Sequence, residues 1–312
     1  MLKEVLEYLP SVSGGNCIDC TLGGAGYTVA IAEKIFPGRV LAIDLDGLAI
    51  ANANALIKKK EILNIDICRG NFNNVYEVAR NVWPPERTEK ISGIVLDLGL
   101  SSAQLMDGNR GFSFQLDAPL EMRFGGRDND YGGISVEKIV NDYKEQEIEN
   151  IIKNYGEERY ARGIAKGIVI ARKNADIKTT KQLVEIIARS VPGAYRNGKK
   201  IHFATRTFQA LRIAANNELA SLESALRQAT DLLMPGGRVI VISYHSLEDR
   251  IVKHFFRNQA KNCVCAPEIP ICRCGHQPEM KIVEKKAILP SQEEIKTNPR
   301  SRSAKLRVAE KR

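Results

Sequence analysis

The chain has 312 residues, of which 44% are hydrophobic and 27% are charged, and its formal net charge is +9. This length and composition fit one large or two ordinary globular domains with an ample core. No apolar run is long enough to span a bilayer and no signal peptide opens the chain, which excludes a membrane-spanning or secreted class and predicts a cytoplasmic protein.

A glycine-rich turn between the first expected strand and the helix that follows it predicts a ligand site. A short helix is expected at residues 2–9, a buried strand at 16–20 and a helix from Tyr27 onward, with Asp19-Cys20-Thr21-Leu22-Gly23-Gly24-Ala25-Gly26 at the turn. Glycines let a ligand approach bare backbone where a Cβ would collide with it. The next strand ends in Asp44, a carboxylate suited to accept hydrogen bonds from a ribose diol. The turn and this acid together predict a nucleoside site.

The order of acids and glycines favours S-adenosylmethionine over a dinucleotide. The dinucleotide fingerprint G-x-G-x-x-G places a pyrophosphate at a helix N-terminus, whereas this loop reads G-G-x-G and follows Asp19. A carboxylate repels a pyrophosphate but attracts a sulfonium and an α-ammonium group. A dinucleotide-dependent oxidoreductase is therefore disfavoured, and a tight turn without a ligand is the remaining alternative.

The later strands predict a parallel sheet interrupted by a helical insertion. Further strands are expected at 40–44, 65–69, 91–98 and 238–243, and a last one at 304–309. Near-continuous apolar strands separated by helices are typical of a parallel sheet that is covered on both faces. Helical periodicity without strand character marks the residues between the fourth and fifth strands, at 135–154, 160–173, 180–189 and 202–227. A connection of this length predicts a domain of its own.

The expected domains are therefore a sheet domain formed by residues 1–104 and 217–312, and an inserted helical domain formed by residues 105–216. Basic residues concentrate in the insertion, since residues 159–212 contain thirteen Lys or Arg against two acidic residues. A second basic segment, residues 281–312, contains ten against four. Such an excess favours a polyanionic partner, above all nucleic acid, bound by the insertion.

Two residues that follow strands are candidates for chemistry. Asp97 ends the fourth strand, where a carboxylate can accept a hydrogen bond from a substrate amine and direct its lone pair toward a methyl donor. No cysteine follows this strand, which argues against methylation at C5 of a pyrimidine. A helix cap or a cofactor-binding acid is the alternative for Asp97. His245, after the fifth strand, could accept a proton or stack on a base, although histidine in such a turn is commonly structural.

Two C-x-C pairs, Cys263-Val264-Cys265 and Cys272-Arg273-Cys274, lie near the C-terminus with His276 close behind. Their spacing is tighter than that of the usual C-x2-C zinc knuckle. They could form a metal clip, a labile disulfide pair or neither, so we assign no metal site from the sequence.

The chain strongly resembles the bacterial 16S ribosomal RNA cytosine-N4 methyltransferases, the RsmH or MraW family, nearly end to end. The strings that carry the resemblance include Asp97-Leu98-Gly99-Leu100-Ser101-Ser102-Ala103-Gln104, Arg110-Gly111-Phe112-Ser113-Phe114, Pro119-Leu120-Glu121-Met122-Arg123, Ala204-Thr205-Arg206-Thr207-Phe208-Gln209-Ala210 and Asn298-Pro299-Arg300-Ser301-Arg302. The resemblance implies an α/β, class I (Rossmann-like) S-adenosylmethionine-dependent methyltransferase sheet with an inserted helical domain. It also implies methylation of the N4 amine of a cytidine in the decoding region.

The substrate implied by this resemblance is 16S rRNA within the small ribosomal subunit or its precursor, with neither DNA nor a membrane as partner. Carried over by position, the cofactor contacts fall on Ala25, Gly26, Tyr27, Asp44, Phe72, Asp97 and Gln104, and we expect Asp97 and His245 to be catalytic.

The chain departs from the family pattern at two places. The family loop usually reads G-x-G-G-H-S, so Tyr27 stands where a histidine contact is usual. An H-x-P-V-like segment usually precedes the first helix, whereas this chain starts at Met1-Leu2-Lys3-Glu4, inside what would be that helix. These departures leave one alternative from another class, a non-catalytic RNA-binding ribosome-assembly factor with a degenerate cofactor pocket.

Overall fold

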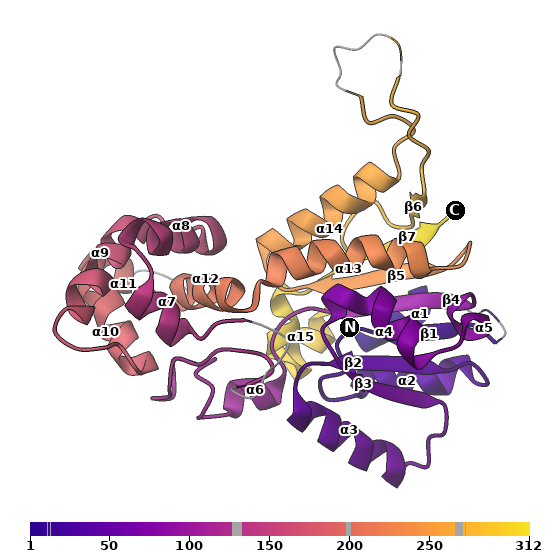
Figure 1. Cartoon of the computed structure of the whole chain (residues 1–312), viewed down its shortest axis with the longest axis horizontal. Coiled ribbons are helices and arrows are strands. Elements are labelled where there is room, and N and C mark those ends of the chain that lie inside the picture. The colour runs from indigo at the N-terminus through magenta and orange to yellow at the C-terminus, as the bar shows by residue number, and fades with distance from the viewer. Residues whose placement is uncertain (11, 13, 127–132, 198–200, 266–270, 272) are drawn as a thin grey trace. The chain divides into compact units, whose positions relative to one another are not determined.

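The structure is a computed structural model that describes residues 1–312 except 11, 13, 127–132, 198–200, 266–270 and 272 (Figure 1). Its contacts divide the chain into two compact units. The first comprises Met1–Gly99 and Leu219–Arg312, and the second comprises Leu100–Glu218. No helix among the described residues combines the length and the apolarity that crossing a membrane requires.

The first unit is built on a seven-stranded sheet with the strand order β3-β2-β1-β4-β5-β7-β6. The strands are β1 (Asn16–Asp19), β2 (Val40–Asp44), β3 (Ile65–Arg69), β4 (Ile91–Asp97), β5 (Arg238–Ser243), β6 (Met280–Ile282) and β7 (Lys305–Lys311). Strands β1 to β5 are parallel, and β7 runs antiparallel to both of its neighbours. This arrangement confirms the predicted α/β, Rossmann-like sheet, whose carboxyl edge is the usual ligand site. The three-residue β6 was not predicted, because it is too short to show any periodicity.

Helices cover both faces of this sheet because successive side chains of a buried strand point to opposite faces. In β4, Ile94 and Leu96 pack with helices α4, α13 and α14, whereas Val95 packs with α1 and α2. In chain order, the helices of this unit are α1 (Leu2–Tyr8), α2 (Gly26–Ile35), α3 (Gly47–Lys59), α4 (Val75–Val82), α5 (Pro85–Thr88), α13 (Glu218–Leu232), α14 (Ser246–Gln259) and α15 (Gln292–Thr297). Two short 3₁₀ turns, η1 (Phe72–Asn74) and η2 (Pro299–Ser303), also belong to it.

The second unit is helical in its described part and has an apolar core of its own. Its helices are α6 (Ser102–Met106), α7 (Val136–Asp142), α8 (Glu145–Gly156), α9 (Ala161–Arg172), α10 (Thr180–Ser190), α11 (Gly193–Asn197) and α12 (Thr205–Asn216). The core side chains include Ile148, Ile164 and Leu211. Helices α8 and α12 pack closely because Gly156 has no side chain, since a Cβ there would lie 2.7 Å from the carbonyl oxygen of Arg206.

Two helical stretches that the sequence predicted as continuous are each divided into two helices. The stretch at 135–154 is broken at Tyr143, which has extended backbone between α7 and α8. The stretch at 202–227 is broken at Asn217, whose φ of +51° is left-handed. Asparagine adopts this conformation more readily than most residues. The apolar periodicity continues across both breaks, so it could not reveal them.

Candidate functional site

The glycine loop after β1 is held by the buried carboxylate of Asp19, whose exposed fraction is 1%. Its Oδ1 accepts a hydrogen bond from the backbone N–H of Thr21 at 3.0 Å, and its Oδ2 accepts one from the Thr28 hydroxyl at 2.6 Å. Asp19 therefore ties the start of the loop to helix α2. Burial raises the pKa of Asp19, and these hydrogen bonds act in the opposite direction. Both oxygens of Asp19 are thus engaged in holding the loop and the start of α2.

The loop leaves open space beside its backbone. A Cβ added at Gly24 or Gly26 would meet no heavy atom within 4 Å among the described residues. Gly23 and Ala25 have φ values of +46° and +60°, which turn the chain sharply into α2. A loop that is bare on one side and anchored on the other has the form of a ligand cradle.

Asp44, at the end of β2, lies against this cradle. Its Oδ2 accepts a hydrogen bond from the Gly23 N–H at 2.8 Å, and its Oδ1 accepts one from the Asp46 N–H at 2.9 Å. Burial raises the pKa of this carboxyl group. Each carboxylate oxygen has two lone pairs, so Asp44 can also accept from a ribose hydroxyl.

The other predicted contacts fall in different places. Phe72 opens the 3₁₀ turn after β3 and packs, half-buried, against the core of the first unit. Tyr27 is half-buried in the first turn of α2, where burial and the negative charge of Asp97 raise its pKa. Gln104 belongs to the second unit, where its Oε1 accepts from the Ser101 N–H in a capping box of α6. The structure thus gathers most of the predicted contacts at the carboxyl edge of the sheet, and Gln104 lies in the other unit.

Asp97, the last residue of β4, connects three strand ends. Its backbone N–H donates to the Thr21 hydroxyl at 2.8 Å, and its Oδ1 accepts from the Tyr244 hydroxyl at 2.9 Å. Burial raises the pKa of Asp97 to about 7, although the hydrogen bond from Tyr244 lowers it. Within the part of the chain that the structure describes, no group donates to Oδ2 of Asp97.

Tyr244 is a site residue to which the sequence analysis gave no role. It follows β5 directly, and its backbone N–H donates to Glu248 Oε2 at 2.8 Å. A Cβ at Gly99 would lie 3.2 Å from the Tyr244 ring, so the glycine leaves room for it. Gly99 also has a φ of +119°, which other residues rarely adopt. A polar aromatic residue directly after a parallel strand was the signal that could have found Tyr244.

His245 caps helix α14. Its Nδ1 accepts from the Glu248 N–H at 3.3 Å, its own N–H donates to Glu248 Oε2 at 3.2 Å, and its Nε2 lies 3.1 Å from Glu248 Oε1. Despite this short distance, Nε2 is buried and makes no hydrogen bond among the described residues. These contacts favour a positioning role, and the catalytic role of His245 stays a prediction.

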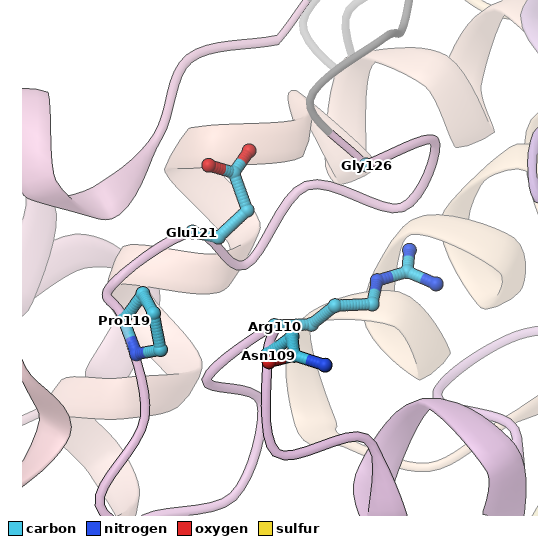
Figure 2. Close-up of a pocket in the computed structure, with 5 residues that line it drawn as sticks. All are labelled: Asn109, Arg110, Pro119, Glu121 and Gly126. Carbon is cyan, nitrogen blue, oxygen red and sulfur yellow. The ribbon is translucent and has the colours of Figure 1, made fainter.

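A separate pocket of about 360 Å³ lies in the second unit, as Figure 2 shows. It is lined by Asn109, Arg110, Pro119, Glu121 and Gly126. Arg110 Nη2 donates to the carbonyl oxygen of Arg123 at 2.9 Å, and Glu121 accepts from Arg123 Nε. The charged side chains thus order the loop around the pocket.

Basic side chains of the insertion are exposed on its helices. They include Arg162 and Lys166 of α9, Lys181 and Arg189 of α10, and Arg196 of α11. Lys199 and Lys200, which belong to the same basic segment, lie outside the described residues.

Comparison with known proteins gives a match over the whole chain. A family model described as the MraW methylase family matches residues 1–312. Three relatives named ribosomal RNA small subunit methyltransferase H are similar over 100% of this chain. They come from Thermomicrobium roseum (46% identity, 92% of the relative covered), Heliobacterium mobile (45%, 97%) and Dehalococcoides mccartyi (47%, 85%). The solved structure of an rRNA methylase from Streptococcus thermophilus aligns with a TM-score of 0.43 and 11% identity, covering 99% of this chain and 93% of that one.

Replacing Asp97 with Asn should change how stability depends on pH. The pKa of Asp97 is higher in the folded chain, about 7, than its ordinary value of 3.8. The stability that protonated Asp97 contributes is therefore fully present below pH 3.8 and is lost as the pH rises to about 7. The free energy of unfolding of the wild type, relative to Asp97→Asn, should fall over this range and stay level above it.

Urea unfolding of both proteins at a series of pH values measures this difference. The variant Asp117→Asn, which removes an exposed carboxylate of the second unit, is the control for loss of charge alone. A constant difference between wild type and Asp97→Asn from pH 4 to 8 would contradict the raised pKa.

Proposed function

Because the chain belongs to the MraW methylase family, we propose that it transfers a methyl group from S-adenosylmethionine to the N4 amine of a cytidine in the decoding region of 16S rRNA. Its sheet is the class I methyltransferase sheet that the sequence predicted. The observation that carries the chemistry is Asp97, a half-buried carboxylate beside the glycine cradle with Oδ1 fixed by Tyr244. A non-catalytic assembly factor is not favoured, since the cradle keeps its open backbone despite the departure at Tyr27.

The residues at the carboxyl edge of the sheet fit S-adenosylmethionine. The open space at Gly24 and Gly26 accommodates a ligand against backbone, and Asp44 at the end of β2 would accept from its ribose hydroxyls. Phe72 and Tyr27 would supply apolar and aromatic surface. When bound, S-adenosylmethionine supplies a methyl group on a positively charged sulfur, which the acidic strand ends attract.

Asp97 would act on the substrate amine through its Oδ2. The lone pair of an exocyclic amine is delocalised into the cytosine ring, so the nitrogen is a weak nucleophile. A carboxylate that accepts from the N–H localises this lone pair and stabilises the positive charge that develops as the bond to carbon forms. Asp97 can then take the proton that the methylated nitrogen loses. A pKa of about 7 suits such proton transfer near neutral pH.

Tyr244 would position Asp97. By occupying Oδ1, the hydroxyl of Tyr244 directs the remaining oxygen toward the substrate and stabilises the ionised carboxylate. The cytosine must leave any stack to present its amine edge-on to this group. His245 and Glu248 hold the turn that carries Tyr244.

The substrate would be bound as 16S rRNA of the small ribosomal subunit or its precursor in the cytoplasm. The exposed Lys and Arg of α9, α10 and α11 support a phosphate-binding role for the insertion. Gln104 and the pocket beside Arg110 belong to this same unit. A cofactor role for Gln104 stays a prediction.

Asp44→Ala should weaken S-adenosylmethionine binding about 10- to 150-fold, because hydrogen bonds to a charged acceptor contribute roughly 1.5–3 kcal/mol. Asp44→Asn keeps one accepting oxygen and should lie in between. Gly26→Val should bind still more weakly, since its side chain fills the open space of the cradle. Isothermal titration calorimetry measures each affinity, with the exposed Glu33→Ala of α2 as a control. Equal affinities for Asp44→Ala and wild type would remove the ribose role.

Asp97→Asn should lower kcat by about 100-fold or more with little change in donor affinity, because the amide lacks the charge that stabilises the transition state. Small subunits or 16S rRNA are incubated with labelled S-adenosylmethionine, and mass spectrometry of the digested nucleosides should detect N4-methylcytidine. A variant with normal kcat at saturating donor but weaker donor binding would make Asp97 a cofactor residue only.

Tyr244→Phe separates the positioning role from mere packing. The rate should rise with pH as Asp97 loses its proton. Loss of the tyrosine hydrogen bond raises the pKa of Asp97 further. The acid limb of the kcat profile should therefore move to higher pH. Tyr76→Phe, at a half-exposed tyrosine of α4, should leave the profile in place. An unshifted limb in Tyr244→Phe would show that the hydroxyl does not act on the catalytic group.

Replacing both Arg162 and Lys166 with Ala should weaken RNA binding and reduce its dependence on salt. Each lost phosphate contact lowers the slope of log K against log salt by roughly 0.7–0.9. Filter binding at several salt concentrations measures this, and donor affinity should not change. The matched control replaces Lys58 and Lys59, two exposed lysines of α3 in the other unit. An unchanged slope would mean that this face of α9 does not contact RNA.

A further inference from the structure

The segment between α14 and β6 closes at its base without forming a core. The N–H of Glu279 donates to the carbonyl oxygen of Gln259 at 3.0 Å, so the two ends of the segment meet where it extends from the first unit's sheet and helices (Figure 1). The described residues between these two form no helix or strand, and most of them are exposed. A segment of this length with so little buried surface needs a cross-link to hold one conformation.

Three thiols meet in this segment. The sulfur atoms of Cys263, Cys265 and Cys274 all lie within 4.8 Å of one another, and those of Cys263 and Cys274 are 3.8 Å apart. Sulfurs that lie about 2.3 Å from a tetrahedral zinc ion are separated by about 3.8 Å from each other. Sulfurs of a disulfide lie about 2.05 Å apart, and a disulfide joins two thiols rather than three. The spacing therefore matches a shared metal ion.

We propose that Cys263, Cys265 and Cys274 bind a structural zinc ion that closes this segment. Each thiol gives up its proton to solvent when its sulfur coordinates the metal. Zinc prefers sulfur and nitrogen ligands and takes four of them in structural sites. The two C-x-C pairs supply ligands from both limbs of the segment, so coordination joins the limbs as a cross-link would.

A tetrahedral site needs a fourth ligand, which we expect from the same segment. His276 is a candidate because it follows Cys274 by two residues and its buried Nε2 has no hydrogen-bond partner among the described residues, although it lies outside the 4.8 Å cluster of sulfurs. Cys272, which completes the second C-x-C pair in the sequence, lies outside the described residues. Separate His276→Asn and Cys272→Ser variants identify it, because loss of the true ligand weakens zinc binding and loss of the other does not.

Metal analysis of the full chain tests the proposal. Protein purified under reducing conditions without added chelator should contain one zinc ion per chain, as measured by inductively coupled plasma mass spectrometry. Replacement of zinc by cobalt should give the absorption bands of tetrahedral cobalt thiolate. The double variant Cys263→Ser and Cys274→Ser should lose the metal, whereas Cys68→Ser, at a cysteine of β3 outside the cluster, should keep it.

A count of free thiols separates zinc from a disulfide. If the cluster binds zinc, protein that is denatured in the presence of a chelator and without a reductant should show all seven cysteines as free thiols. A count of five or fewer without zinc would overturn the proposal in favour of a disulfide. The proposal would be overturned outright if the protein showed seven free thiols and contained no zinc even after zinc was added to the solution. The wild-type measurements decide the question even if the double variant fails to fold.

Discussion

The buried carboxylate of Asp19 is the constraint on which the carboxyl edge of the sheet depends. A buried carboxylate without partners is costly, and this one is satisfied only if the loop after β1 turns back on it. Thr21 and Thr28 supply the required donors from the two ends of the loop. Because the Thr21 hydroxyl also accepts from the Asp97 N–H, the same set of hydrogen bonds fixes the cradle and the end of β4 together. The glycine loop and the end of β4, where we propose the methyl donor and the substrate amine to bind, are thus held by one hydrogen-bond network.

Three acids at the carboxyl ends of neighbouring strands differ in the partners that their carboxylate oxygens have. Asp19 uses both oxygens within the loop, and Asp44 uses both on backbone N–H groups of neighbouring turns. Asp97 has one oxygen on Tyr244, while burial raises its pKa into the neutral range. Position along a parallel sheet brings these acids to one edge, and under the proposed function we expect their hydrogen-bond partners to decide which of them acts on the ligand.

Features encoded locally could be predicted from the sequence, whereas those made by distant partners could not. The apolar run of β4 and the glycine loop are visible within a short window, and the insertion shows as a long helical stretch between two strands. The break at Asn217 depends on one backbone conformation that leaves the apolar pattern intact. The pairing of Asp97 with Tyr244 joins residues 147 positions apart, so no local pattern contains it. Gln104 fits both the cofactor contact expected from the family resemblance and a capping box, and sequence alone does not choose between them.

The insertion also has a consequence for how the chain reaches this state. The central neighbours β4 and β5 pair in parallel, yet the whole of the second unit lies between them in the chain. Closing so long a flexible connection costs conformational entropy, at about 0.6 kcal/mol for each doubling of its length. The second unit has its own core and can collapse first, through contacts close in sequence. Folding of the insertion then shortens the connection, so the centre of the sheet is expected to assemble late, as the slow step of the folding reaction.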